Sequence, residues 1–483
     1  MSIINFIKRN ISLVVALLTT AVFLVANSLL LLNENYSLLF VPFLGMALVF
    51  FIVRYETALL SIAFLTPFAI NVSLFDQMQL SLPSEPMMIL CTIMFLFRVL
   101  AGDNYDRRIL KHPVTILLIC SIVWMFITSL FSVDILTSIK YTLARIWFVT
   151  PFFFACVQIF QNKRRIRQLV WGYTIALCVV IAITTFKTLG HFHELQMLHR
   201  VMKPFYNDHT AYGCAIALVL PIVTFFIFEK QGAWKQRIPA FIVFSLLLTG
   251  VALSYCRAAW MSLLISLGIF IIIKFRIDFR WIILAAVAFI SIVAINFDDI
   301  SISMQRNRQD SSLDLSGQIQ SISNISTDAS NLERLNRWSC ALKMFAKDPI
   351  LGWGPGTYQF NYAPFQESSM LTIISTNAGD NGNAHSEYLG PLAEQGILGC
   401  LLVIAVFGAT FVTGIRLYKK SKDRHIANLA LAFTLCLTTY YVHAFFNNFL
   451  DTDKLSLPFW AFTAAIVSLD IYSKDAPDAP SEA

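Results

Sequence analysis

The stretch that decides the fold covers residues 385–420 and reads HSEYLGPLAEQGILGCLLVIAVFGATFVTGIRLYKK. Between Glu394 and Arg416 it carries no charged residue, over about the ~20 residues that an α-helix needs to cross a membrane. Apolar and polar residues do not alternate along it, as they would in a strand of a membrane barrel. The stretch therefore predicts a membrane-spanning helix that starts just after a histidine, His385.

The same pattern recurs along most of the 483 residues, of which 57% are hydrophobic and only 13% are charged. Soluble domains usually carry about 25% charged residues, so the composition indicates an integral membrane protein. We predict an all-α polytopic membrane protein with about 12–14 transmembrane helices. The fourteen candidate spans lie at about residues 11–32, 37–53, 57–73, 84–101, 113–132, 142–160, 168–189, 209–228, 238–256, 258–274, 280–297, 388–416, 426–447 and 455–472.

The distribution of Lys and Arg predicts the orientation, because loops on the cytoplasmic side are enriched in both. Most of the 36 basic residues fall on one side if both termini are cytoplasmic, so the net charge of +7 needs no nucleic-acid partner. The longest gap between spans then lies outside the cytoplasm. We expect four regions: a membrane domain of about eleven spans (1–297), a long periplasmic loop (298–384), C-terminal spans with the histidine (385–472) and a cytoplasmic tail (473–483).

The second half of the long loop predicts an amphipathic helix on or near the membrane surface. Residues 330–349 read SNLERLNRWSCALKMFAKDP, in which Ser330 and Glu333 form a capping-box pattern. Asp348–Pro349 ends the helix. The apolar residues recur at helical spacing, and they are Leu332, Leu335, Trp338, Leu342 and Phe345. Arg334 and Arg337 lie one turn apart on one side of this helix.

Two further arginines lie at the outer ends of predicted spans. Arg145 lies about one turn inside a span, and Arg257 lies in a tight outer turn. A charged residue in a span is costly and is a functional-site hypothesis by default. Both side chains would also suit anchoring at the lipid headgroups. The functional alternative is that they bind an anion, since guanidinium grips phosphate with two parallel hydrogen bonds.

Another outer loop is rich in histidine. It holds His191, His193 and His199, whose spacing matches no strong metal motif, so a solvated interfacial loop and a polar binding surface stay open beside a metal site. The motif NDHTAYG follows at the start of a span. Its Asn207, Asp208 and His209 are candidates for supporting a site at the outer face.

His385 has the position and chemistry of a general base. It ends the long loop where the next span begins, and imidazole has an unperturbed pKa near ~6.5, suited to taking a proton from a hydroxyl. A structural interfacial histidine is the alternative. Glu387 and Glu394 follow. Glu394, about two turns past His385, would orient the helix or a partner arginine, and an ion-pair role and a catalytic role both stay open for it. Arginines that bind a lipid diphosphate and a histidine that activates a sugar hydroxyl together suit glycosyl transfer at the outer face, where no nucleotide is available.

These residues resemble the O-antigen ligase and polymerase superfamily of bacterial membrane glycosyltransferases. The ligase motif is a His, then Asn, Ser or Gln, nine residues, Gly, two residues, then Gly, Thr or Tyr. It is matched in full by His385–Ser386, Gly396 and Gly399. Arg257 and Gly268 also show the arginine-to-glycine spacing of the polymerases, whereas Met261 replaces the leucine of the ligases' arginine motif. The resemblance is best over about residues 205–450.

The resemblance implies a GT-C-like inverting enzyme that needs neither a metal nor a cofactor. It implies transfer of glycan from undecaprenyl diphosphate to a lipid A–core hydroxyl, on the periplasmic side of the bacterial inner membrane. His385 would act as base, Arg257 would take part in catalysis and bind the diphosphate, and Arg145, Arg334 and Arg337 would be further diphosphate ligands. A polymerase using a second lipid-linked repeat is the alternative, followed by a protein O-glycosylating relative. A non-enzymatic transporter would show polar residues near the membrane midplane.

Overall fold

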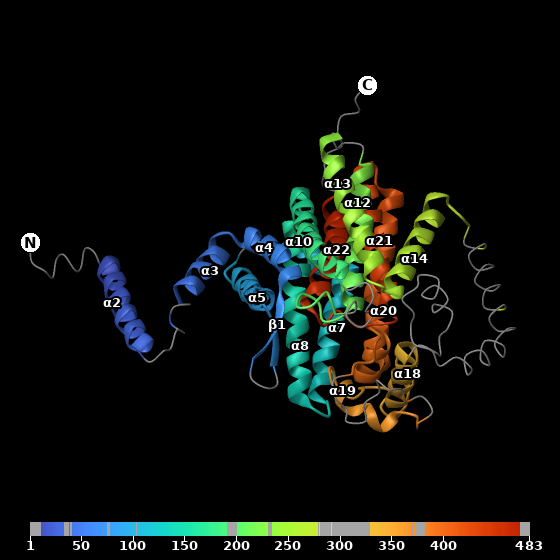
Figure 1. Cartoon of the computed structure of the whole chain (residues 1–483), viewed down its shortest axis with the longest axis horizontal. Helices are drawn as coiled ribbons and strands as arrows, with labels where there is room; N and C mark the ends of the chain where they lie inside the picture. Colours follow the sequence, from blue (N-terminus) through green and yellow to red (C-terminus); the bar gives the residue numbers. More distant parts are fainter. Residues whose placement is uncertain are drawn as a thin grey trace, which may run out of the picture. The chain divides into compact units, whose positions relative to one another are not determined.

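The computed structural model describes residues 11–32, 38, 41–74, 78–102, 104–190, 200–229, 234–278, 280, 291, 329–368, 371 and 382–473. The chain divides into two compact units, Met1–Ala58 and Leu59–Ala483 (Figure 1). The first unit contains α2 (Ile11–Leu32), α3 (Val41–Val53) and the start of α4 (Tyr55–Leu65). With 13 residues, α3 is shorter than the predicted span 37–53 and shorter than a straight helix needs to cross a membrane.

The second unit is a helical bundle. Eight helical segments among the described residues are long and apolar enough to cross a membrane, which confirms an all-α polytopic membrane protein. These segments are α7 (Pro113–Leu130), α8 (Ile135–Val149) continuing through the π-helical turn η3 (Thr150–Ala155) into α9 (Cys156–Ile159), α10 (Lys163–Leu189), α12 (His209–Phe228), α14 (Arg257–Lys274), α20 (Leu389–Lys420), α21 (Arg424–His443) and α22 (Asp453–Tyr472).

Shorter elements complete the second unit. They are η2 (Thr66–Phe68), β1 (Ile70–Leu74), β2 (Met78–Leu82), α5 (Ser84–Leu100), α6 (Arg107–Lys111), α13 (Trp234–Leu253), α18 (Ala329–Lys347), α19 (Tyr358–Asn361) and η4 (Ala363–Phe365). The predicted span 280–297 lies outside the described residues, apart from residues 280 and 291.

The predicted span 57–73 is wrong in its second half. Helix α4 ends at Leu65, where Pro67 follows in a 3-10 turn. Residues 70–74 form β1, which pairs antiparallel with β2 so that Asn71 lies opposite Ser81. The physical reason is visible in the strand itself, since its residues alternate between apolar and polar with the period of two that a strand requires.

Helix α22 lies at the centre of the bundle. It contacts α12, α20 and α21 on some sides and η3 and α9 on others. Nearly all of its residues are buried, as expected for a helix that is apolar around its whole circumference. Residues 444–452 form the loop that connects the end of α21 to the start of α22.

The long loop ends in a compact substructure packed against α20. The buried face of α18 carries Cys340, Ala341 and Met344, which contact residues of α19 and of the segment around Ala393. Helix α18 begins at Ala329, one residue before the predicted cap, and its predicted apolar face is not the buried one. Leu342 is 50% exposed, whereas Arg337 is buried. The helix therefore turns its small and polar side, rather than its large apolar side, toward the protein.

Helix α20 is broken at Gly396, and the break receives a loop. Gly396 has φ +67° and ψ −169°, a conformation that essentially only glycine adopts. The freed backbone groups are satisfied by residues 349–354: Ile397 N–H donates to Pro349 O over 3.0 Å, and Gly354 N–H donates to Glu394 O over 2.8 Å. A Cβ on Gly396 would lie 2.1 Å from Ile350 O. Backbone hydrogen bonds thus join the segment that leads into GWGPG (residues 352–356) to the motif segment AEQGILG (residues 393–399).

Candidate active site

His385 occupies a strained turn just before α20. Its φ of +48° lies in the left-handed region, which few non-glycine residues adopt. Its backbone N–H donates to Asn383 Oδ1 over 3.0 Å, and the three following residues lead into α20. Such strain persists only where the surroundings enforce it, and it clusters at functional sites. The side chain is partly buried.

Helix α18 brings two arginines to this turn. Arg334 Nε donates to the carbonyl oxygen of Phe446 over 3.2 Å. Arg337 Nε donates to Glu333 Oε1 over 2.8 Å, and its Nη1 donates to the carbonyl oxygen of Asn383 over 3.3 Å. The Arg337 guanidinium also lies over the Tyr362 ring, 4.6 Å from its centroid. The pair predicted one turn apart therefore reaches both the segment before His385 and the segment after α21.

The charge state of His385 follows from these neighbours. Burial and the positive charges of Arg334 and Arg337 lower its pKa to about 3, and Asp208 and Asn447 oppose this shift only in part. An imidazole in this position is neutral at physiological pH, so one ring nitrogen is free of a proton and able to accept one. The expectation of an ordinary pKa near ~6.5 is wrong for the protein without a bound anion.

Asn447, which interacts with His385, leads to two further residues, and none of the three figured among the sequence candidates for the site. His443, at the end of α21, places Nε2 3.6 Å from the Cys256 sulfur and Nδ1 3.3 Å from Asn447 Nδ2. Burial raises the pKa of the Cys256 thiol to about 11, so this cysteine is not an activated nucleophile. The sequence did carry a signal for His443 and Asn447. Asn447 follows His443 by about one helical turn, at the outer end of a predicted span.

Arg257 is the first residue of α14, and the preceding Cys256 contacts His443. The turn before it is tight: Tyr255 has φ +50°, and Cys256 N–H donates to Ser254 Oγ over 3.2 Å. The structure thus brings the start of α14 to the His443 side of the cluster. The role of Arg257 in binding the diphosphate stays a prediction.

Arg145 belongs to a neighbouring network. Its guanidinium lies 3.3 Å from Asp451 Oδ1 and donates to the carbonyl oxygen of Leu450 over 3.1 Å and to the Tyr141 hydroxyl over 3.2 Å. The Tyr141 hydroxyl also donates to Asp451 Oδ1 over 2.8 Å. A diphosphate ligand at Arg145 would have to compete with these partners, and the role of Arg145 in binding the diphosphate stays a prediction.

The two glutamates of the motif hold the surrounding segments together. Glu387 Oε1 accepts from the Tyr440 hydroxyl over 2.7 Å and from Leu450 N–H over 2.8 Å, which joins α21 to the loop before α22. Burial and the nearby Asp451 raise the pKa of Glu387. Glu394 Oε1 accepts from Tyr358 N–H over 2.9 Å at the first turn of α19. Each glutamate thus accepts a hydrogen bond from a backbone N–H group of another segment.

Asp208 is the N-cap residue of α12 and faces the same cluster. Its Oδ1 accepts from Thr210 N–H over 2.7 Å, from Ala211 N–H over 2.8 Å and from the Thr210 hydroxyl over 2.6 Å, a strong N-cap. Its negative charge acts on His385 and His443. Asn207 Oδ1 accepts from Asn71 Nδ2 over 3.2 Å, and His209 is the first residue of the helix.

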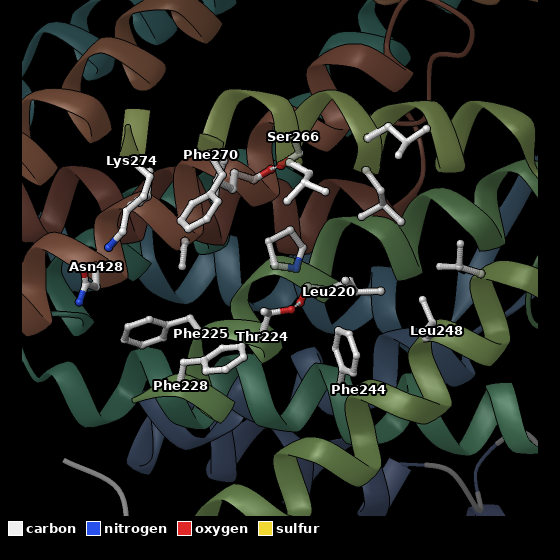
Figure 2. Close-up of a pocket in the computed structure, with 18 of the residues that line it drawn as sticks. Leu220, Thr224, Phe225, Phe228, Phe244, Leu248, Ser266, Phe270, Lys274 and Asn428 are labelled. Carbon is white, nitrogen blue, oxygen red and sulfur yellow. Dashed lines mark hydrogen bonds between the residues drawn. The ribbon is translucent and has the colours of Figure 1, made fainter. Parts of the chain in front are cut away.

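An apolar cavity of about 1360 Å³ lies between α12, α13, α14 and α21. Phe225, Phe228 and Phe244 line it, with Lys274 and Asn428 at one end (Figure 2). Its lining also includes Val251 and Trp260, close in sequence to the turn before Arg257. The cavity therefore extends along these spans from the neighbourhood of the candidate site, and its lining suits a hydrocarbon chain.

Within the described residues, no group of three His, Cys, Asp or Glu side chains is arranged to hold a metal ion. His191, His193 and His199, the residues of the alternative metal interpretation, lie outside the described residues.

Comparison with known proteins supports the family resemblance over part of the chain. No curated protein matches the chain. Residues 241–404 match the family model of the O-antigen ligase. This region runs from α13 through α14, α18 and α19 into α20, so it includes Arg257, Arg334, Arg337 and His385. The match supports the resemblance of this chain to the O-antigen ligase and polymerase superfamily.

Proposed function

We propose that this protein is an O-antigen ligase-type glycosyltransferase. It takes a glycan from undecaprenyl diphosphate and transfers it to a hydroxyl of lipid A–core oligosaccharide, on the periplasmic face of the inner membrane. The observation that carries the proposal is the geometry around His385: a neutral imidazole in a strained turn, with two arginines of α18 beside it, inside the region that matches the O-antigen ligase family.

The chemistry is one displacement. The acceptor oxygen attacks the sugar carbon that carries the diphosphate, from the face opposite the leaving group, so the configuration inverts. The acceptor proton passes to the free nitrogen of His385 as the new C–O bond forms. The bond to the diphosphate breaks with its electron pair, and the arginines stabilise the charge that develops on the leaving group. His385 then returns the proton to solvent.

The electrostatics suit this order of events. In the absence of an anion, the arginines disfavour the imidazolium form of His385. A bound diphosphate offsets their charge, so the basicity of His385 rises when the donor is in place. His385 is therefore more basic when the donor diphosphate, the leaving group of the reaction, is bound.

The apolar cavity supports a donor with a hydrocarbon tail. Its volume of about 1360 Å³ and its length along α12, α13 and α14 suit a segment of a polyprenyl chain. With the tail there, the headgroup would lie near the turn before Arg257. Arg257 and Arg334 would then grip the diphosphate from two sides.

The test is to replace each arginine by lysine in purified protein and to measure turnover and donor binding separately. Arg257→Lys and Arg334→Lys should each lower turnover by roughly 10²-fold, because a single ammonium does not reproduce the guanidinium fork. Arg164→Lys, on the exposed start of α10, is the matched control and should be unchanged. Normal turnover in both site variants, at equal expression, would remove the arginines from the mechanism.

A polymerase remains the second candidate, because the Arg257 to Gly268 spacing is the polymerase pattern. The acceptor distinguishes the two. In a strain that lacks the gene, lipid-linked polymer of normal length with nothing attached to lipid A–core indicates a ligase. Attachment of single repeats indicates a polymerase.

A further inference from the structure

A second cavity, smaller and polar, adjoins the candidate active site. Its volume is about 230 Å³, the size of one or two sugar rings rather than a lipid. Four elements enclose it: the β1–β2 hairpin, the start of α5, the segment before α12 and the segment that leads into α22. Its lining includes Asn71, Ser81, Glu85, Asn207, Asp208, Asp451, Asp453 and Lys454, together with the aromatic residues Phe205, Tyr206 and Phe449.

Asp208 connects this cavity to the chemistry. It lines the cavity, and its charge acts on His385. Arg334 and Arg337, in contrast, do not line it. The cavity is also linked by geometry to the segment of His385: Leu450, between its lining residues Phe449 and Asp451, donates its N–H over 2.8 Å to Glu387, two residues after His385. If the arginines hold the diphosphate of the donor, this separate cavity is available to the acceptor.

The cavity wall is rich in hydrogen-bond acceptors. Four carboxylates line it, and the single cation among the lining residues, Lys454, lies 3.7 Å from Asp453 Oδ1. Carboxylates accept hydrogen bonds from sugar hydroxyls and repel a sugar that itself carries a carboxylate or phosphate. Aromatic side chains beside such acceptors provide apolar surface for the C–H face of a ring.

Ser81 contributes a buried hydroxyl group to this wall. It is 3% exposed, and its hydroxyl has no hydrogen-bond partner among the described residues. It lies directly opposite Asn71 in the hairpin, so both side chains are on one face of the sheet, and both line the cavity. A buried hydroxyl without a partner costs stability, and it is explained if a ligand supplies the partner.

We propose that this cavity binds an uncharged, hydroxyl-rich sugar unit of the acceptor, with Ser81 and Glu85 among its hydrogen-bonding groups, and that it excludes acidic sugars. The inference rests on the proposed function, because it assigns the sugar to the acceptor of that reaction. It adds the chemical class of the unit that is recognised.

The test is sugar binding to the purified full-length protein, observed by saturation-transfer NMR without any donor. The probes are methyl glucoside, methyl galactoside and methyl N-acetylglucosaminide, with methyl glucuronide as the acidic comparison. At least one neutral probe should bind, and the glucuronide should bind at least tenfold more weakly. In turnover assays, the neutral probe that binds should compete with the acceptor and not with the donor.

Ser81→Ala separates a binding role from a structural one. It should weaken binding of the neutral probe by about fivefold to tenfold while leaving the melting temperature unchanged or raising it, since the lost hydroxyl had no partner. Glu85→Gln, which keeps the shape of the side chain, should also weaken binding. Ser73→Ala, an exposed position of the same hairpin, is the matched control and should change neither quantity.

Three results would overturn the proposal: no binding of any neutral probe, equal binding of the glucuronide, or competition with the donor alone. His385→Ala keeps the two ideas distinguishable. If it abolishes transfer while no neutral probe binds the wild type, the proposed function stands and the sugar site fails. If the probe binds as predicted while His385→Ala transfers normally, the sugar site stands and the base assignment fails.

Discussion

His385 is chemically unlike a histidine at a membrane surface, and the difference comes from its neighbours. The motif predicted its importance and its place at the end of a loop. It did not predict the pKa of about 3, because burial and the proximity of Arg334 and Arg337 arise only when α18 packs against α20. The same holds for His443 and Cys256, which lie 187 positions apart in the chain and meet through the packing of α14 on α21.

The lowered pKa of His385 predicts how kcat/KM depends on pH. A base must be unprotonated, and a pKa shifted from ~6.5 to about 3 keeps the free enzyme in that form as the pH falls from 7 to 5. The ratio kcat/KM, which reports the free enzyme, should therefore show no acid limb with the midpoint near 6.5 of an ordinary histidine. A limb at that midpoint would contradict the neutral, desolvated state of His385.

Glu387 is the control for this pH profile, since its raised pKa makes it a second group that titrates. The Glu387→Gln variant keeps an acceptor for the Tyr440 hydroxyl and removes the titration. Any inflection that disappears in this variant belongs to Glu387 rather than to His385.

At the scale of elements, the glycines of the motif have a clear structural role. From the sequence alone, glycines at 396 and 399 would be expected to let α20 approach a neighbouring helix closely. Gly396 instead ends one helical segment and starts another, and the neighbour that it admits is the loop at Ile350. The sequence indicated close packing correctly, but the identity of the partner depends on a contact between segments almost fifty residues apart.

Replacing Gly396 by alanine should therefore be severe. The residue has to adopt a conformation reserved for glycine, and its Cβ would meet Ile350 O at 2.1 Å. We expect a loss of about 2–4 kcal/mol in the free energy of unfolding and, with the loop displaced, a loss of transfer. Gly408→Ala in the same helix meets nothing within 4 Å and should be neutral or slightly stabilising. Equal melting temperatures for both variants would contradict the role given to Gly396.

For two other elements, the sequence did not predict the structure fully. Strand β1 was missed because Ile70 and Val72 extend the apolar run of the predicted span 57–73, although their alternation with Asn71 and Ser73 is typical of a strand. In α18, helical spacing correctly predicted a helix, but it did not reveal that the opposite, small and polar face packs against the protein. The apolar pattern cannot reveal which side meets protein when the other side has access to lipid.

At the scale of the whole molecule, the bundle has eight described spanning segments, and the site is assembled at one end of them. The contributing segments are the starts of α12, α14 and α20 and the end of α21. The Lys and Arg bias predicts that this end faces outward, together with the loop over residues 298–384. Most of that loop before α18 lies outside the described residues.

A cysteine introduced at Ser321 tests the orientation. It should react with a membrane-impermeant thiol reagent in cells whose outer membrane alone has been permeabilised. Ser421→Cys, between α20 and α21, is the control for the opposite face and should react only after lysis. The reverse labelling pattern would invert the predicted orientation and remove the argument for a lipid-linked donor.

The central claim is that His385 takes the proton from the acceptor hydroxyl, and the turnover and donor affinity of His385→Ala test it most directly. General-base catalysis contributes about 10²- to 10⁴-fold, so turnover by the purified variant should fall on that scale while the affinity for the lipid-linked donor stays within about twofold of wild type. Turnover at the wild-type rate would show that the base lies elsewhere. Loss of donor binding together with turnover would show that His385 is a ligand of the diphosphate and contradict its role as the base.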